Sequence, residues 1–292
     1  MSSLRVFALT ALAMLAFAGN SLLCRLALKQ SAIDPASFTT VRLAAGTAAL
    51  WLLVRLRSGR PSGAGNWGSA LALFAYAAGF SFAYVSLPAA SGALLLFGAV
   101  QATMIGYGLW RGERLRGWQI AGLLLALSGL VGLLMPGLSA PPWRGAVLML
   151  GAGIAWGIYS LRGKGAGDPT AVTAGNFLRA LAMTALMSLV LLRDASLDPM
   201  GLAYAVASGA LASGLGYAVW YSVLPALEAT DAATVQLSVP VIAAIGGVVL
   251  LGEALSIRLV VASAAILGGI ALVILKKPPA APAGSDDPGR TV

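Results

Sequence analysis

The sequence predicts an all-α polytopic membrane protein, with ten transmembrane helices arranged as two inverted five-helix repeats. Three observations support this fold class. Of the 292 residues, 59% are hydrophobic and 10% are charged, which leaves too little polar surface to cover a soluble globule. Apolar runs of about 20 residues, the length of a helix that crosses a bilayer, recur along the chain. Glycine contributes 36 residues, as is typical where membrane helices pack closely.

The ten predicted spans are separated by short polar breaks or by breaks that contain Gly and Pro. Asp34-Pro35 and Asp168-Pro169 mark the start of the second and seventh spans, because a proline in the first turn of a helix lacks only an N–H that has no partner there. Residues 277–292 are rich in Pro, Ala, Gly and Asp, so a disordered cytoplasmic tail is expected. The spans cover residues 6–28, 36–56, 67–87, 89–110, 117–135, 145–163, 169–192, 201–224, 229–252 and 256–275.

Two features within the spans predict how the helices pack. Pro240 lies inside the ninth span, where it removes a backbone hydrogen bond and predicts a kink. Small residues recur one turn apart in the fifth and tenth spans, among them Gly268 and Gly269. Such faces let membrane helices approach closely. Replacing Gly268 with leucine is therefore expected to cause a clash between helices.

The two halves of the chain resemble each other at a spacing of 140 residues. Gly112-Glu113 follows one apolar run, and Gly252-Glu253 follows another at the corresponding place. AFAGNS at 16–21 also resembles AWGIYS at 155–160, which favours a transmembrane first span over a signal peptide. A repeat of five spans has an odd number, so the second copy enters the membrane inverted. Inverted repeats are typical of secondary transporters. We predict a first repeat over 1–138 and a second over 139–276.

The positive charges predict the orientation in the membrane. With the N-terminus inside, twelve of the nineteen Lys and Arg residues lie on the inner side and five on the outer side. The other two, Arg42 and Arg179, fall within spans. This excess places both termini in the cytoplasm, and we expect a multi-pass protein of the bacterial inner membrane. Because the basic residues lie between apolar runs, the net charge of +9 does not indicate nucleic-acid binding.

Polar and aromatic side chains in the middle of spans are the candidates for a substrate site. Tyr and Trp suit a pocket for a flat amphipathic ligand, although core packing or an interfacial belt uses the same residues. Amides in a span are expected to face protein or water, since facing lipid is costly. The candidate substrate-binding residues are Asn20, Tyr76, Phe80, Tyr84, Phe97, Gln101, Trp156, Tyr159, Tyr217, Trp220, Gln236 and Ser238.

Arg42 and Arg179 are candidate partners for a substrate carboxylate, because a guanidinium matches a carboxylate with two hydrogen bonds. The alternative for each is a structural anchor. No Asp or Glu lies in the middle of a span, which argues against proton exchange with cationic drugs. The chain also lacks histidine, a phosphate-binding GxxxxGK[ST] loop and a metal-ligand cluster, and it has one cysteine, Cys24. We therefore expect no enzyme activity, cofactor or metal.

Three segments resemble a known family. They are VRLAAGTAAL at 41–50 around Arg42, the stretch LPALEATDAATVQLSVPVIAAIGGVVLLGE at 224–253, and Gly112-Glu113. Over about residues 6–275 the chain resembles the EamA-type branch of the drug/metabolite transporter superfamily. It departs from that pattern at Val100, where the second repeat has Pro240. ASGALLLFGAVQ at 90–101 is most similar to the YddG-type aromatic amino-acid exporters.

This resemblance implies a ten-helix fold that exports aromatic and other neutral amino acids by alternating access through a central cavity. The expected partners are the small-molecule substrate and the lipid bilayer. Two alternatives remain open from the sequence. One is export of another small metabolite or drug, and the other is a non-transporting membrane scaffold.

Overall fold

The computed structural model describes residues 3–58, 65–112, 114–135, 140–163, 168–223, 226–227 and 235–274. Within these ranges the chain is helical and contains no β-strand. The helices are α1 (Ser3–Gln30), α2 (Pro35–Ser58), α3 (Trp67–Tyr84), α4 (Ala89–Trp110), α5 (Gly117–Leu134), α6 (Trp143–Arg162), α7 (Pro169–Val190), η1 (Leu192–Asp194), α8 (Pro199–Ala207), η2 (Ser208–Leu215), α9 (Gly216–Val223), α11 (Ser238–Leu251) and α12 (Ile257–Ile274). The predicted tail at 277–292 lies outside the described residues.

Eight helical segments in the described part are long and apolar enough to cross a membrane. One of them, Pro199–Val223, joins α8, η2 and α9, and η2 is a π-helical stretch within it. The 14-residue α11 is a shorter apolar helix, and the 18-residue α3 is at the position of the third predicted span. Large apolar side chains such as Leu124, Val131 and Leu189 are exposed, as expected where lipid is the solvent. The prediction of a polytopic helical membrane protein is confirmed.

Three acidic residues begin helices by the mechanism that the sequence indicates. Asp34, Asp168 and Asp198 each precede a proline at the first helical position, and each side chain accepts hydrogen bonds from backbone N–H groups of the following turn. These carboxylates satisfy N–H groups that have no partner in the helix itself. The predicted starts of α2 and α7 are confirmed. The same signal at Asp198 was missed.

The repeated Gly-Glu motif has a backbone explanation in its glycines. Gly112 has a φ of 93° and follows α4, and Gly252 has a φ of 63° and follows α11. Both angles lie in the region that side-chain-bearing residues rarely adopt. The Gly252 N–H donates to the carbonyls of Gly247 and Val248, which closes the end of α11.

The helical structure is interrupted just before Pro240, since residues 235–236 are helical and residue 237 is a turn; the kink itself stays a prediction. Helix α11 begins at Ser238, so Pro240 lies in its first turn, where a missing N–H breaks no helical hydrogen bond. The ninth span was predicted to begin at 229. Of that stretch, residues 229–234 lie outside the described part of the chain.

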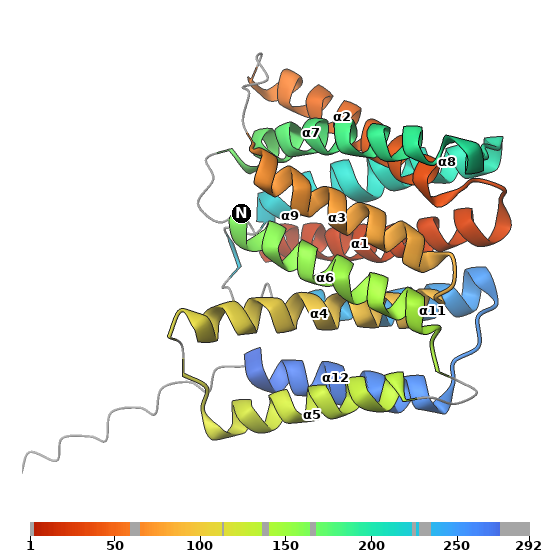
Figure 1. Cartoon of the computed structure of the whole chain (residues 1–292). Coiled ribbons are helices and arrows are strands. Elements are labelled where there is room, and N and C mark those ends of the chain that lie inside the picture. The colour runs from red at the N-terminus through yellow and green to blue at the C-terminus, as the bar shows by residue number, and fades with distance from the viewer. Residues whose placement is uncertain are drawn as a thin grey trace, which may run out of the picture.

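The helices run side by side, and successive long segments alternate in direction (Figure 1). The α2–α7 pair lies at the top edge of Figure 1 and the α5–α12 pair at the bottom edge, with the other helices between them. We call the end of the bundle where α1 begins and α12 ends the N-terminal face. It is on the left in Figure 1, and the other end is the opposite face.

Helices α5 and α12 approach closely through small residues, as predicted, but not through the residue expected. A Cβ at Gly269 would lie 2.6 Å from the Ala126 nitrogen, and one at Gly122 would lie 2.7 Å from the Gly269 carbonyl oxygen. A Cβ at Gly268 would meet nothing within 4 Å. Gly268 faces away from α5, so the expected clash at this position is wrong and belongs one residue later.

Candidate functional site

A central cavity lies where helices from both halves of the chain meet. Six of the candidate residues line it, and they come from α1, α3, α4, α6 and α9. The cavity volume available to water centres is about 20 Å³, which is room for about one water molecule. The lining consists of Phe17, Asn20, Ser21, Tyr76, Phe80, Leu96, Phe97, Trp156, Ala212 and Tyr217. In this conformation a larger ligand needs side chains to move.

Asn20 connects three helical segments in the wall of the cavity. Its Nδ2 donates to the Tyr76 hydroxyl at 3.1 Å, and its Oδ1 accepts from the Ser208 hydroxyl at 2.6 Å. All three residues are at most 5% exposed. The expectation that this mid-span amide faces protein rather than lipid is confirmed, because burial in an apolar medium requires such partners.

Trp156 is the centre of an aromatic cluster. Its ring centroid lies 4.7 Å from that of Tyr76 and 5.1 Å from that of Tyr217. Tyr76 in turn stacks at 5.4 Å on Phe80. These tilted contacts fall in the range that aromatic pairs prefer. The cluster gives the cavity a wall that suits a flat or apolar group.

Six candidate residues lie outside the cavity lining. Tyr84 is one turn beyond Phe80 and contacts it edge-on at 4.8 Å, and Tyr159 lines a separate pocket near the N-terminal face. Trp220 packs against Phe17 at 5.9 Å. Gln101 is buried without reaching the cavity. The remaining two, Gln236 and Ser238, lie immediately before and at the start of α11, also outside the lining.

Some lining residues were not predicted. Residue type alone does not point to these four positions, because apolar or small residues occur throughout the spans. They are Phe17, Ser21, Leu96 and Ala212. For Phe17 and Ser21 a signal was available, since both lie in the AFAGNS segment that the two halves share. Ser208, which contacts Asn20, carried no comparable signal.

The two arginines within spans have different surroundings. Arg42 is 1% exposed, and its guanidinium carbon lies 5.0 Å from the Phe80 ring centroid and 5.5 Å from that of Tyr76. Arg179 is partly exposed, donates to the Gly175 carbonyl at 2.9 Å and lies 6.0 Å from the Trp67 ring centroid. Arg42 therefore contacts two residues of the cavity wall, Tyr76 and Phe80.

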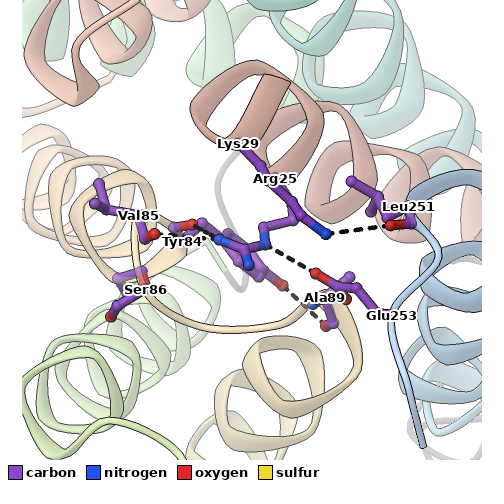
Figure 2. A network of polar contacts seen from close by, with 9 residues as sticks. Arg25, Lys29, Tyr84, Val85, Ser86, Ala89, Leu251 and Glu253 are labelled. Atoms are coloured by element: carbon purple, nitrogen blue, oxygen red, sulfur yellow. Dashed lines mark hydrogen bonds and ion pairs between the residues drawn. The ribbon is translucent and has the colours of Figure 1, made fainter. Parts of the chain in front are cut away.

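A polar network joins four helix ends at the opposite face (Figure 2). Arg25 of α1 donates from Nε to Glu253 at 2.9 Å and from Nη1 to the Tyr84 carbonyl at 2.9 Å. The other oxygen of Glu253 accepts the Ala89 N–H at 2.7 Å. Lys29 donates to the Leu251 carbonyl at 3.1 Å. Arg25, Glu253 and Ala89 thus connect α1, the end of α11 and the start of α4. We call these three residues the lock.

The lock adjoins a wide pocket through Glu253 and is linked to the cavity wall through Tyr84. Tyr84 contacts Phe80 of the cavity wall. Glu253 lines the wide pocket, which also includes Ser86, Ser91 and Ser256. The volume available to water centres there is about 270 Å³.

A second polar network lies at the N-terminal face. Arg162, at the end of α6, donates to the Ser69 hydroxyl and to the Asn66 side-chain oxygen, each at 3.1 Å. The Asn66 N–H donates to Asn176 of α7 at 2.9 Å. These residues line a polar pocket together with Tyr159. This pocket adjoins the cavity wall, since the Tyr159 ring centroid lies 5.4 Å from that of Trp156.

At the opposite face, the loop before α2 and the loop before α8 are hydrogen-bonded to each other through the carboxylates that cap these two helices. Asp34 accepts the Ser196 N–H at 2.9 Å, and Asp198 accepts the Ala32 N–H at 3.1 Å. Partial burial raises the pKa of Asp34, but hydrogen bonds from Ser37, Ser196 and Ala36 together lower it more, so its pKa lies below the usual value.

No group of three or more His, Cys, Asp or Glu side chains that could hold a metal ion occurs within the ranges that the structure describes. The one cysteine, Cys24, is buried. The cavity combines polar groups at Asn20 with an aromatic wall at Trp156.

The fold and the cavity define the class: a polytopic helical membrane protein with a buried polar and aromatic cavity between its helices. The sequence profile of the EamA-like transporter family matches residues 143–275. An uncharacterized protein of Pseudomonas aeruginosa is 61% identical over 272 residues, covering 92% of this chain and 94% of that protein. The chain belongs to the EamA-like transporter family, a part of the drug/metabolite transporter superfamily.

Relatives with a named activity match over part of their length. The threonine/homoserine exporter RhtA of Salmonella typhimurium is 34% identical over 168 residues, 53% of this chain and 55% of the exporter. The exporter of the same name from Escherichia coli K12 is 34% identical over 142 residues. The chain thus aligns with about half the length of these exporters. A crystal structure matches with a TM-score of 0.66 at 22% identity, covering 93% of this chain and 98% of the other, and supports the fold alone.

Proposed function

We propose that this protein is a secondary transporter of the bacterial inner membrane that exports aromatic and other neutral amino acids. The observation that carries this proposal is the central cavity, in which the Asn20 amide and the aromatic cluster around Trp156 line one space. An amino acid has a charged head and a side chain, and the cavity offers polar and aromatic groups for both. The family and the names of the RhtA relatives support amino-acid export.

The proposal includes two inverted repeats, over 1–138 and 139–276, with both termini in the cytoplasm. If the two repeats are equivalent, α1 corresponds to α6, α2 to α7, α3 to α8–α9, α4 to α11 and α5 to α12. Each contact between two helices then has an equivalent contact in which the repeats change places. The α3–α6 contact is equivalent to α1–α9, α4–α6 to α1–α11, and α3–α7 to α2–α8, and all six contacts occur. The positive-φ glycines after α4 and α11 occupy equivalent places. These correspondences support a ten-span protein built from two related halves.

Alternating access requires that the cavity opens to one face at a time. At the opposite face, Arg25 of the first half contacts Glu253 of the second. At the N-terminal face, Arg162 of the second half contacts Asn66 and Ser69 of the first. Each network therefore joins the two halves at one face. In the proposed cycle one network breaks while the other holds, and the substrate enters from the N-terminal face.

Export of small hydroxyl amino acids is a second candidate. It is favoured by the names of the RhtA relatives and by the small volume of the cavity. The two candidates differ in what they require of Trp156. An aromatic substrate stacks on its ring, whereas threonine or homoserine does not.

The test is flux of radiolabelled Phe, Trp, Thr and homoserine in proteoliposomes, with and without a pH gradient. If the wild type transports aromatic substrates, Trp156→Ala should reduce their flux about two- to twelvefold more than that of Thr, since an aromatic pair contributes about 0.5–1.5 kcal/mol beyond burial. Trp110→Ala is the matched control, because Trp110 is 81% exposed and remote from the cavity. Equal losses for Phe and Thr would contradict the aromatic site. Wild-type flux of Thr and homoserine alone would favour the second candidate, and no flux of any amino acid would refute amino-acid export.

A further inference from the structure

Arg42 is a buried cation with no anionic partner among the residues that the structure describes. Its side chain is 1% exposed, and its Nε and Nη1 atoms have no hydrogen-bond partner among the described residues. It lies seven residues into α2, about 10 Å along the helix from its start. An arginine at such depth is costly unless it is paired, because burial removes the hydration of the charge.

The surroundings of Arg42 compensate this charge only in part. The guanidinium lies over the rings of Phe80 and Tyr76 at 5.0 and 5.5 Å, and cation–π attraction replaces a fraction of the lost hydration. In the part of the chain that the structure describes, acidic side chains occur only at helix ends and in connections. The ion pair found there joins Arg25 to Glu253. No side chain in the described spans supplies the missing negative charge.

The rings that Arg42 contacts belong to the wall of the cavity, since Tyr76 and Phe80 both line it. Tyr76 also accepts a hydrogen bond from Asn20, and Asn20 accepts one from Ser208. The backbone of Arg42 is pressed against Gly209, the residue after Ser208. The guanidinium of Arg42 therefore lies next to the polar side of the cavity, one ring away from its space.

We propose that Arg42 binds the carboxylate of the substrate, so that the cavity selects molecules with a carboxylate over the corresponding amines and alcohols. A guanidinium accommodates a carboxylate through two parallel N–H···O bonds, and Arg42 has two unpaired nitrogens. Binding requires a shift of the Tyr76 or Phe80 ring, consistent with the small volume of the cavity in this conformation. This inference rests on the proposed function and specifies its substrate class.

The test compares ligands that differ only in the carboxylate. Phenylalanine and phenylalaninol share the ring and the ammonium group, as threonine and threoninol share the hydroxyl side chain. Binding of each is measured with purified protein by competition against the labelled amino acid that the wild type binds. In the wild type, the amino acid should bind about 10- to 150-fold more tightly than its alcohol, the range expected for hydrogen bonds to a charged group. In Arg42→Gln this preference should disappear, because affinity for the amino acid falls while affinity for the alcohol is unchanged.

Two further variants separate binding from folding. Arg42→Lys keeps the charge but loses the paired geometry, so it should fold like the wild type and retain part of the preference. Arg55→Gln removes an exposed arginine of the same helix, which lies over the Trp51 ring and outside the cavity lining, and should leave the preference intact. Equal weakening of acid and alcohol in Arg42→Gln, with the full preference kept in Arg42→Lys, would show a structural role and overturn the inference. If the wild type binds amino acids and alcohols equally, the inference fails while transport stands. If it binds neither, both fail.

Discussion

The lock at the opposite face makes a quantitative prediction about the conformational equilibrium. Glu253→Gln removes the negative charge that faces Arg25, and the amide keeps one acceptor oxygen in place of two. It then cannot accept from both the Arg25 Nε and the Ala89 N–H. The side chains of Arg25 and Glu253 are 12% and 8% exposed, so their interaction is less screened than that of a surface ion pair.

The expected size of the effect follows from these contacts. A hydrogen bond to a charged group contributes about 1.5–3 kcal/mol, and every 1.4 kcal/mol is a factor of about ten in an equilibrium constant. If the lock is intact only while the opposite face is closed, its loss shifts the population toward the state open at that face by about 10- to 150-fold. The Arg25→Glu, Glu253→Arg double variant restores the ion pair in the reverse order. It should recover only part of the closed-state population, because an arginine at position 253 cannot accept a hydrogen bond from the Ala89 N–H.

The assay is the rate at which a cysteine in the cavity is modified from the opposite face. Ala212 lines the cavity and is 4% exposed, so Ala212→Cys in a Cys24→Ala background places one thiol there. A membrane-impermeant thiol reagent added at the opposite face should react faster by about 10- to 150-fold in Glu253→Gln, as the population shift requires. Arg258→Gln is the matched control, since Arg258 is at the same face and bonds the Met135 carbonyl rather than the lock. An unchanged rate in Glu253→Gln, or an equal rise in both variants, would refute the assignment of the lock as a gate.

Two further predictions concern stability. Gly269→Ala should lower the melting temperature of the purified protein, because a Cβ there would lie 2.6 Å from a backbone nitrogen of α5. Gly268→Ala is the control and should leave the melting temperature unchanged, because a Cβ there meets nothing within 4 Å. Equal melting temperatures for the two variants would contradict the packing of α5 on α12. The lowered pKa of Asp34 stabilises the fold above its ordinary value near 3.8, and this contribution is lost as the pH falls through the lower folded-state pKa. Asp34→Ala should therefore cost about 0.5–2 kcal/mol at neutral pH, as for a lost helix cap, and should reduce the loss of stability below about pH 4. Chemical unfolding at several pH values measures both effects, with Asp194→Ala, at an exposed aspartate, as the control. If Asp34→Ala loses as much stability as the wild type below about pH 4, the assignment of the cap is contradicted.

The sequence alone determined where the helices lie. Apolar length fixes which segments can cross a membrane, and local backbone chemistry fixes their ends, as at Asp34-Pro35 and Gly252. Both depend on neighbours within a few residues. The exception was α11, where Pro240 falls in the first turn rather than inside the helix.

The lining of the cavity was decided by the tertiary structure. Tyr76, Phe80 and Tyr84 share one face of α3, but only the first two line the cavity, because Tyr84 is one turn further along the axis. Trp156 and Tyr159 are divided in the same way between two pockets.

The same holds for contacts between helices. Arg25 and Glu253 are 228 residues apart, and nothing near either residue indicates the other. Gly268 and Gly269 are neighbours on α12, but only Gly269 lies on the side of the helix that faces α5. In a soluble helix the polar face shows which side is buried, but a membrane helix is apolar toward both lipid and protein. The sequence therefore specifies the helices, and only their packing specifies which faces meet.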